Sequence, residues 1–392
     1  MVTTPHRSRS FPQFLSPTRV DELNRSRVIQ ALCDHGPMSR ADLEALADVH
    51  GASIDSAVGS LIDRGLIEER NGAGEHVLWF GARAGLSGGA VIGEGTYEAA
   101  LVNARGDLIE HAVGEFDAED RSGHAVAVAA LEGLEKVLPR KREDLLGIGV
   151  AVPGTCDPDT GEVITSGQVP ALEGSRFSQM LQSTMGREIL VDNDSHALAL
   201  GEKWFGSGRG NLTFASVQTG AGLGVGLVLD GQIYRGPTGT AGELGHTAVV
   251  PQGERCTCGL TGCWETIATI RWLRGEAERA QLPKAGRMDA NKLRELAHES
   301  RAARRLFEDY ADHLAIGLAN LAHILGVTLF VLHGDAVGGG EEFRSMIERS
   351  VRERTLPGLN EEIRVVLSSL DQRAAVLGAA GLVLSSAFDL RT

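Results

Sequence analysis

Three cysteines within eight residues form the most specific chemical signal in this 392-residue chain. Cys256, Cys258 and Cys263 supply three thiolates on one short segment. Because the chain has only five cysteines, this cluster is more typical of a metal site in a reduced compartment than of a disulfide framework. Cys33 and Cys156 fit small residues of the core. The alternative for the cluster is a chance grouping of core cysteines.

A second polar feature follows the apolar run at residues 189–191. Asn193 and Asp194 come directly after this predicted strand, where a carboxylate can point from the strand end into a cleft. The alternative for Asp194 is a purely local role as the N-cap of the next helix.

The first 81 residues divide into an arm and a compact module. Residues 1–17 are rich in arginine, proline and serine, which predicts a flexible arm. Helical periodicity then predicts three short helices in residues 18–63, with the second capped by Ser39 and the third opening at Ser53. Two strands follow, and the dipeptide Asn71-Gly72 predicts the turn between them.

Three helices followed by a hairpin are the arrangement of a winged helix-turn-helix, so residues 18–81 predict a DNA-binding domain. Hydroxyl side chains of the third helix are expected at base edges and arginines at phosphates. The predicted base contacts are Ser53, Ser56 and Ser60, and the predicted phosphate contacts are Arg25, Arg27 and Arg64. Eleven acidic residues against eight arginines in residues 1–82 count against DNA binding. The alternative is a helical domain that only mediates dimer contacts.

The remainder of the chain predicts a larger domain of two lobes. Residues 82–89 are small and glycine-rich, which predicts a linker, and residues 90–392 form the domain behind it. A hairpin interrupted by glycines occurs near residue 90 and again near residue 214. Two copies of one pattern favour two related α/β lobes that face a cleft.

Composition excludes several classes of protein. Hydrophobic residues make up 42% of the chain and charged residues 23%, which is the balance of a folded globular protein. The formal net charge of -14 argues against a positively charged coat for unspecific nucleic-acid binding. No apolar stretch is long enough to cross a bilayer, and the first residues do not resemble a signal peptide, so we expect a cytoplasmic protein without a membrane partner.

Four segments resemble the ROK family of repressors, open reading frames and sugar kinases. They are VDNDSHALALGE at 191–202, QTGAGLGVGLVLDGQIYRG at 218–236, GTAGELGHTAV at 239–249 and CTCGLTGCWE at 256–265. The resemblance implies an actin-like, hexokinase-like domain of two α/β lobes around a sugar cleft. With the winged helix-turn-helix in front, it points to the repressor branch.

The resemblance also assigns roles to particular residues. It adds His246 to the three cysteines as the fourth ligand of one structural zinc ion per chain, since Cys3His is a closed tetrahedral set. It implies a ring of polar side chains that bind the hydroxyl groups of a sugar. This ring comprises Asn193, Asp194, Glu243, His246, Glu265 and Gln168, of which Gln168 stands where many relatives carry asparagine.

The phosphate site departs from the pattern of the kinases. Ile92 stands where they carry an aspartate in the first phosphate loop, and Glu94 places a negative charge beside the phosphates. His333 precedes Gly334 where a nucleotide-binding protein would prefer paired glycines. The glycine loop at residues 220–224 survives, but hairpin geometry alone explains such glycines. We therefore predict that no kinase activity remains.

These observations together predict a sugar-responsive transcriptional regulator. We expect a homodimer or a dimer of dimers on a two-fold symmetric operator, with a monosaccharide or a derivative as the effector. Sugar binding is expected to release DNA, with a signal passed through the linker at 82–89. The alternatives are an ATP-dependent sugar kinase of the ROK family and a sugar-binding scaffold whose winged helix contacts another protein.

Overall fold

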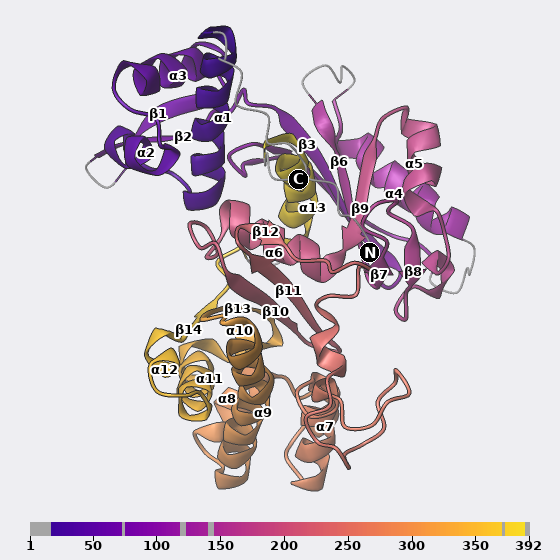
Figure 1. The fold of residues 1–392 in the computed structure, drawn as a ribbon. Coiled ribbons are helices and arrows are strands. Elements are labelled where there is room, and N and C mark those ends of the chain that lie inside the picture. The colour runs from indigo at the N-terminus through magenta and orange to yellow at the C-terminus, as the bar shows by residue number, and fades with distance from the viewer. Residues whose placement is uncertain (1–16, 73–74, 118–122, 140–144, 371–372, 389–392) are drawn as a thin grey trace, which may run out of the picture.

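A computed structural model describes residues 17–72, 75–117, 123–139, 145–370 and 373–388 of the chain. It contains an N-terminal module and two lobes, each of which is built on a five-stranded sheet (Figure 1). The arm predicted for residues 1–17 lies outside the described residues, except for Pro17 at the start of the first helix.

The N-terminal module comprises the predicted three helices and hairpin. Its elements are α1 (Pro17–His35), α2 (Arg40–Ala47), α3 (Ala52–Asp63), β1 (Ile67–Gly72) and β2 (Glu75–Phe80). Ser39 caps α2 as predicted, because its hydroxyl accepts a hydrogen bond from the Asp42 backbone N–H. Met38 pairs with Leu78 across an antiparallel bridge, so the hairpin is joined to the segment between α1 and α2. Buried Val58 and Leu61 of α3 complete the core of this module.

The predicted turn of the hairpin is wrong by two residues. Asn71 pairs with His76 and Gly72 with Glu75, so the connection falls at residues 73–74, which lie outside the described residues. The register is set at the other end of the hairpin, where Ile67 pairs with Phe80 and both side chains are buried.

The predicted linker at 82–89 is also shorter than expected, because strand β3 (Leu86–Ile92) begins inside it. Gly89 belongs to this strand, and a Cβ added there would lie 2.6 Å from the carbonyl oxygen of Val376. Glycine therefore allows a helix to approach the strand closely at this position. The connection between module and lobe is left with residues 81–85.

The first lobe has a sheet with strand order β5-β4-β3-β6-β9. Besides β3, its strands are β4 (Thr96–Asn103), β5 (Leu108–Glu115), β6 (Leu145–Val152) and β9 (Ile189–Asn193). Helix α4 (Gly123–Val137) and helix α5 (Phe177–Met185) pack on one face, and the C-terminal helix α13 (Ala374–Phe388) packs on the other. A short hairpin, β7 (Thr155–Cys156) and β8 (Val163–Thr165), stands at the carboxyl end of β6.

The second lobe has a sheet with strand order β12-β11-β10-β13-β14. Its strands are β10 (Phe214–Thr219), β11 (Leu223–Leu229), β12 (Gln232–Ile233), β13 (Leu329–Gly334) and β14 (Arg364–Leu367). Its helices are α7 (Ile270–Arg279), α8 (Ala290–Ala297), α9 (Arg301–Leu325), α10 (Asp335–Gly338), α11 (Gly340–Arg354) and α12 (Leu359–Glu362). The two similar lobes and both glycine-interrupted hairpins agree with the prediction. Across the described residues, no helix combines the length and apolar character that a membrane span requires.

Helix α6 (Asp194–Phe205) lies between the two lobes (Figure 1). It packs on strands β10 and β11 on one side and on α13 on the other. The contact with α13 is close, since a Cβ added at Gly378 would lie 1.8 Å from the carbonyl oxygen of Ala197. Helices α6 and α13 therefore form one tightly packed pair.

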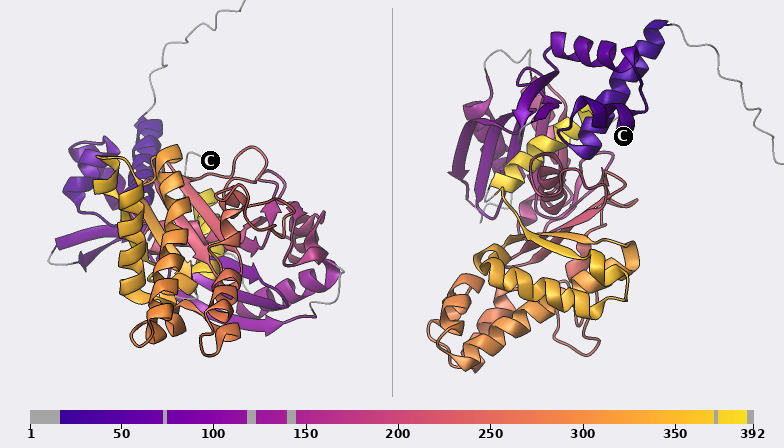
Figure 2. Two further views of the ribbon diagram at one scale, coloured as in Figure 1. Left: turned by 90° about the horizontal axis from the view of Figure 1, so that it is seen from below. Right: turned by 90° about the vertical axis from the view of Figure 1, so that its left-hand side faces the viewer.

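The N-terminal module packs directly on this helix pair. The Phe80 ring lies 4.9 Å from that of Phe388 in α13 and 5.7 Å from that of Trp204 in α6. The Trp204 indole donates a hydrogen bond of 2.9 Å to the Ser385 hydroxyl. Figure 2 shows the module on the side of the molecule away from the helices of the second lobe. Its position is thus fixed by buried aromatic contacts in addition to the short connection at 81–85.

Candidate functional site

The four predicted metal ligands lie together. The ligand atoms of His246, Cys256, Cys258 and Cys263 all lie within 4.8 Å of one another. Two thiol sulfurs, those of Cys258 and Cys263, are 3.7 Å apart, and the Cys256 sulfur is 3.6 Å from His246 Nδ1. A tetrahedral zinc ion with Zn–S bonds of about 2.3 Å would hold its sulfurs about 3.8 Å apart. The donor set and its spacing therefore fit zinc.

The backbone of this loop is shaped for the cluster. Cys263 pairs with Ala248, and Arg255 pairs with Thr261, in two short antiparallel bridges. Gly262 has φ of 76°, and a Cβ added there would lie 1.7 Å from the carbonyl oxygen of Val250. Only glycine fits this turn, which brings Cys263 back toward the other two cysteines.

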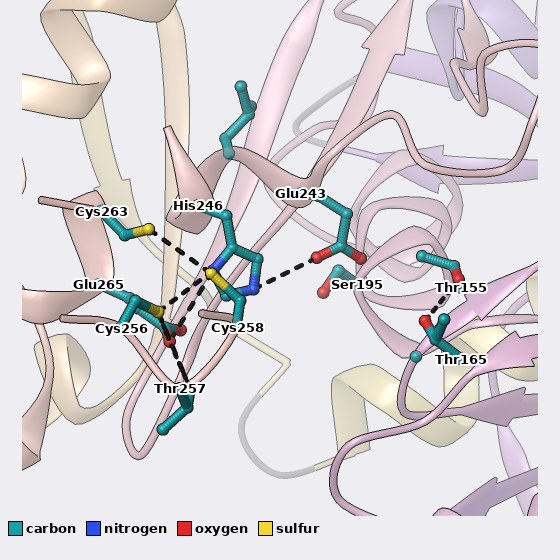
Figure 3. A network of polar contacts seen from close by, with 12 residues as sticks. Thr155, Thr165, Ser195, Glu243, His246, Cys256, Thr257, Cys258, Cys263 and Glu265 are labelled. Atoms are coloured by element: carbon teal, nitrogen blue, oxygen red, sulfur yellow. Dashed lines mark hydrogen bonds and ion pairs between the residues drawn. The ribbon is translucent and has the colours of Figure 1, made fainter. Parts of the chain in front are cut away.

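His246 stands between the cysteine cluster and Glu243, as Figure 3 shows. Its Nδ1 faces Cys256, whereas its Nε2 lies 3.8 Å from the carboxylate of Glu243. The two roles predicted for His246 therefore use different atoms, with Nδ1 toward the metal and Nε2 toward the sugar. Buried Glu265 contacts the same cluster, because its carboxylate accepts a hydrogen bond of 3.1 Å from the Cys256 thiol.

Asn193 holds the start of α6. Its side-chain oxygen accepts hydrogen bonds from the backbone N–H groups of Ser195 and His196, and its amide donates one of 2.6 Å to the carbonyl of Gly154. Asn193 is thus the N-cap of α6, and the alternative assignment of that role to Asp194 is wrong. One amide hydrogen of Asn193 is left for a ligand.

Asp194 is a carboxylate with an altered pKa. Burial, with a smaller contribution from the nearby carboxylate of Glu243, raises its pKa to about 6, although hydrogen bonds from Ser195 oppose the shift. Asp194 belongs to α6, and Glu243 begins a 3-10 helix of the second lobe (Glu243–His246). Two acidic groups from different elements therefore face the same space, where sugar hydroxyls can donate hydrogen bonds to both.

Gln168 is the sixth predicted member of the polar ring, and it is exposed in the turn that follows β8. Sequence reasoning missed Thr155 and Thr165, whose hydroxyls are 2.7 Å apart on the far side of Glu243 from the cysteines (Figure 3). Threonines in a short hairpin carry no pattern that separates them from ordinary strand residues.

The structure also places the residues that depart from the phosphate-binding pattern of the kinases. The Ile92 side chain is buried in the core of the first lobe, and Glu94 is exposed on the turn between β3 and β4. His333 is buried in β13 beside the Ser216 hydroxyl at 3.0 Å, and burial lowers its pKa to about 4. His333 is therefore a neutral core residue at physiological pH.

The residues predicted to contact DNA fall into two groups. Ser53 and Ser56 are exposed on α3, Ser60 is half-buried, and Arg64 is exposed directly after the helix. Arg25 is half-buried, and Arg27 donates a hydrogen bond of 3.0 Å to the Asp48 carbonyl at the end of α2.

Sequence reasoning missed Arg40 at the start of α2. Its guanidinium lies 3.4 Å from the carboxylate of Asp55 on α3 and 3.3 Å from that of Glu69 on β1. The positive charge of Arg40 thus partly neutralises two of the acidic residues whose number argues against DNA binding.

Comparison with known proteins agrees with this arrangement. The sequence model of the ROK family matches residues 88–386 of this chain. A xylose repressor of Caldicellulosiruptor bescii is 27% identical over 94% of this chain and 97% of its own length. The crystal structure of a ROK family transcriptional regulator, a homologue of the E. coli MLC protein, superposes with a TM-score of 0.74 at 24% identity and covers 94% of this chain and 99% of its own.

A kinase is similar over a smaller part of the chain. The ROK family glucokinase of Streptomyces griseus, solved in complex with glucose and AMPPNP, has a TM-score of 0.64 and 26% identity. It covers 76% of this chain but 99% of its own length. The repressor and the regulator thus match a share of this chain that the kinase leaves unmatched.

Proposed function

Because this chain belongs to the ROK family, we propose that it is a DNA-binding transcriptional regulator of carbohydrate genes, with a monosaccharide or a derivative as its effector. One structural observation carries the proposal. The helix that begins with Asp194 at the candidate sugar site carries Trp204 in its last turn, packed against the N-terminal module. A regulator needs such a connection between sensor and reader, whereas a kinase does not.

The cluster of His246 and three cysteines is proposed to hold one structural zinc ion. With four protein ligands the ion would keep no open position, so its role is to fix the loop and not to activate water. His246 and Glu265 would then be held at the edge of the cleft, and sugar affinity would depend on the metal.

The regulator is proposed to act as a dimer or a dimer of dimers on a two-fold symmetric operator. One module with few uncompensated arginines buries too little surface for useful affinity on its own. Selection of bound fragments from the source genome should recover inverted repeats with half-sites about 10 or 20 base pairs apart. Recovery of single asymmetric half-sites would count against a symmetric dimer, and recovery of no DNA would favour the protein-binding scaffold.

Replacement of Arg64 tests the DNA-reading surface. Arg64→Gln should weaken operator binding several-fold and reduce the slope of log affinity against log salt by about 1, because one phosphate contact is lost. Fluorescence anisotropy at several salt concentrations measures both. Arg349→Gln is the matched control, since Arg349 is an exposed arginine of α11 in the second lobe. An unchanged salt slope in Arg64→Gln would show that α3 does not lie on the operator as proposed.

We propose that kinase activity is lost because the first phosphate loop departs from the pattern of the kinases. An ATP-consumption assay with D-xylose and D-glucose should show no sugar-dependent turnover, because buried Ile92 cannot manage the metal and water around the phosphates. The S. griseus glucokinase is the positive control. Sugar-dependent ADP formation by this protein would favour the kinase alternative.

A further inference from the structure

A buried histidine beside the sugar site has two partners that can only accept hydrogen bonds. His196 of α6 is 2% exposed, its Nδ1 lies 2.8 Å from the carboxylate of Asp192, and its Nε2 lies 2.9 Å from the carbonyl oxygen of Ala241. A neutral imidazole has one N–H and can donate only one of these bonds. Asp192 also accepts hydrogen bonds from the Arg235 guanidinium and the Asn193 backbone N–H, which favours its ionised form. With Asp192 ionised, both bonds of His196 form together only when both ring nitrogens carry a proton, so the geometry points to an imidazolium.

The surroundings of His196 favour that charge. Asp192 is buried, and its second oxygen accepts a hydrogen bond of 2.7 Å from the Arg235 guanidinium. Burial alone would raise the pKa of Asp192, but His196 and Arg235 lower it to about 2. Burial alone would lower the pKa of His196, but Asp192 and the Ala241 carbonyl hold it above its ordinary value. Arg235 also acts on His196 and opposes its protonation, and His196 in turn lowers the pKa of Asp194 on its own helix.

The partners of this network belong to two different parts of the fold. Asp192 lies on β9 of the first lobe, and His196 lies on α6. Arg235 and Ala241 lie beyond β12 of the second lobe, where the Ala241 backbone N–H closes the segment by donating to the Arg235 carbonyl at 3.1 Å. The network therefore holds both ends of the segment 235–241 against the first lobe.

This segment leads directly into the sugar site. Gly242 follows it with φ of 104°, and a Cβ added there would lie 2.2 Å from the carbonyl oxygen of Val225, so only glycine fits where the segment packs against β11. Glu243 comes next and starts the 3-10 helix that ends at His246. The location of the Ala241 carbonyl therefore sets where the Glu243 carboxylate stands relative to Asp194.

We propose that His196, as an imidazolium held between Asp192 and Ala241, is a positioning residue that fastens the segment carrying Glu243 and so sets the affinity of the site for sugar. The effect on sugar rests on the proposed function, whereas the charge state and the fastening of the segment do not. Arg235 assists by holding Asp192 from the second lobe.

Nuclear magnetic resonance of full-length protein labelled with 15N-histidine tests the charge state. The His196 signals are identified by their absence in His196→Gln. At pH 8 both ring nitrogens should show the shifts and attached protons of an imidazolium, with or without sugar. A single protonated nitrogen at this pH would overturn the proposal.

Hydrogen exchange tests the fastening without any ligand. Backbone amides in residues 235–246 should exchange at least tenfold faster in His196→Gln than in wild type, because glutamine cannot make both bonds. His111→Gln is the matched control, since His111 lies on the edge strand β5 and pairs only with surface Glu98 at 2.8 Å. Unchanged exchange in His196→Gln would contradict the proposal. Arg235→Gln, which changes a partly exposed side chain, provides the same comparison if His196→Gln does not fold.

Calorimetric titration with D-xylose and with D-glucose tests the role in recognition. His196→Gln should weaken binding of whichever sugar wild type binds by at least tenfold, while operator affinity without sugar stays within threefold. Wild-type sugar affinity in this variant would refute the positioning role. If wild type binds neither sugar, D-xylose and D-glucose are excluded as effectors, and the resonance and exchange experiments still decide whether His196 fastens the segment.

Discussion

Purified protein should contain about one zinc ion per chain, and Cys258→Ser should lose both the metal and much of its thermal stability. The four ligand atoms converge within 4.8 Å, and binding energy at a structural zinc site is folding energy. Loss of one thiolate should therefore lower the melting temperature by roughly 10 °C or more. Elemental analysis and calorimetry measure the two effects.

The control for this experiment is Cys33→Ala. Cys33 is a buried thiol of the N-terminal module and lies outside the cluster, so the variant should keep its zinc. Metal-free protein should also bind sugar weakly, because two residues of the proposed sugar site, Glu265 and His246, contact the cysteine cluster. A wild-type protein that is free of metal and fully folded would contradict the proposed zinc site.

Local patterns with a chemical meaning could be predicted well. The spacing of the three cysteines predicted that they cluster, because they lie on one short loop. The end of the apolar strand predicted the place of Asp194, because the chain changes there from a strand to a helix. The turn between β11 and β12 is likewise a local feature, since Asp230 and Gly231 both have positive φ, as a two-residue hairpin turn requires.

Features that depend on distant packing could not be predicted in the same way. Gly89 resembles a linker residue in sequence, but it lies in β3 because α13, which is almost 300 residues later in the chain, crosses the strand there. The network around His196 has the same character. The spacing of Asp192 and His196 is visible, but the partners Arg235 and Ala241 are known only from the fold.

The route of the signal is another such feature. Sequence reasoning placed the coupling in the linker, because a short glycine-rich segment separates the two domains. The fold adds a more direct path, since Phe80 of the N-terminal module is packed against Trp204 and Phe388. Helix α6 spans about 18 Å from Asp194 to Phe205. A shift of α6 on sugar binding would therefore move the surface on which the module rests.

Asp194→Ala should abolish the response to sugar and leave operator binding intact. In the proposed function the carboxylate accepts hydrogen bonds from sugar hydroxyls, whereas the proposed DNA-reading helix α3 belongs to the N-terminal module, which packs near the other end of α6. The wild-type response should amount to about 1 to 3 kcal/mol, or roughly 5- to 150-fold weaker operator binding with sugar. A titration of D-xylose or D-glucose on labelled operator measures it, with Asp159→Ala as the control because Asp159 is an exposed carboxylate of the same lobe. A mutant with the wild-type midpoint and amplitude would place the effector elsewhere.

The pH dependence of stability gives the same variant a second test. Burial raises the pKa of Asp194 to about 6, above the value of 3.8 for a free side chain, so the folded state holds this proton more tightly than the unfolded state does. The resulting stability is present below pH 4 and is lost as the pH rises through 6. Removal of the carboxylate should therefore shift the free energy of unfolding in favour of the mutant between pH 4 and pH 7.5.

Allowing for partial exposure, the shift is about 1 to 2 kcal/mol. Denaturant titrations of both proteins at the two pH values measure it, and equal pH profiles would mean that the pKa of Asp194 is not raised in the folded protein. Because Asp194 lowers the stability of the folded protein when it is ionised, its presence is better explained by a role in ligand binding than by a role in folding.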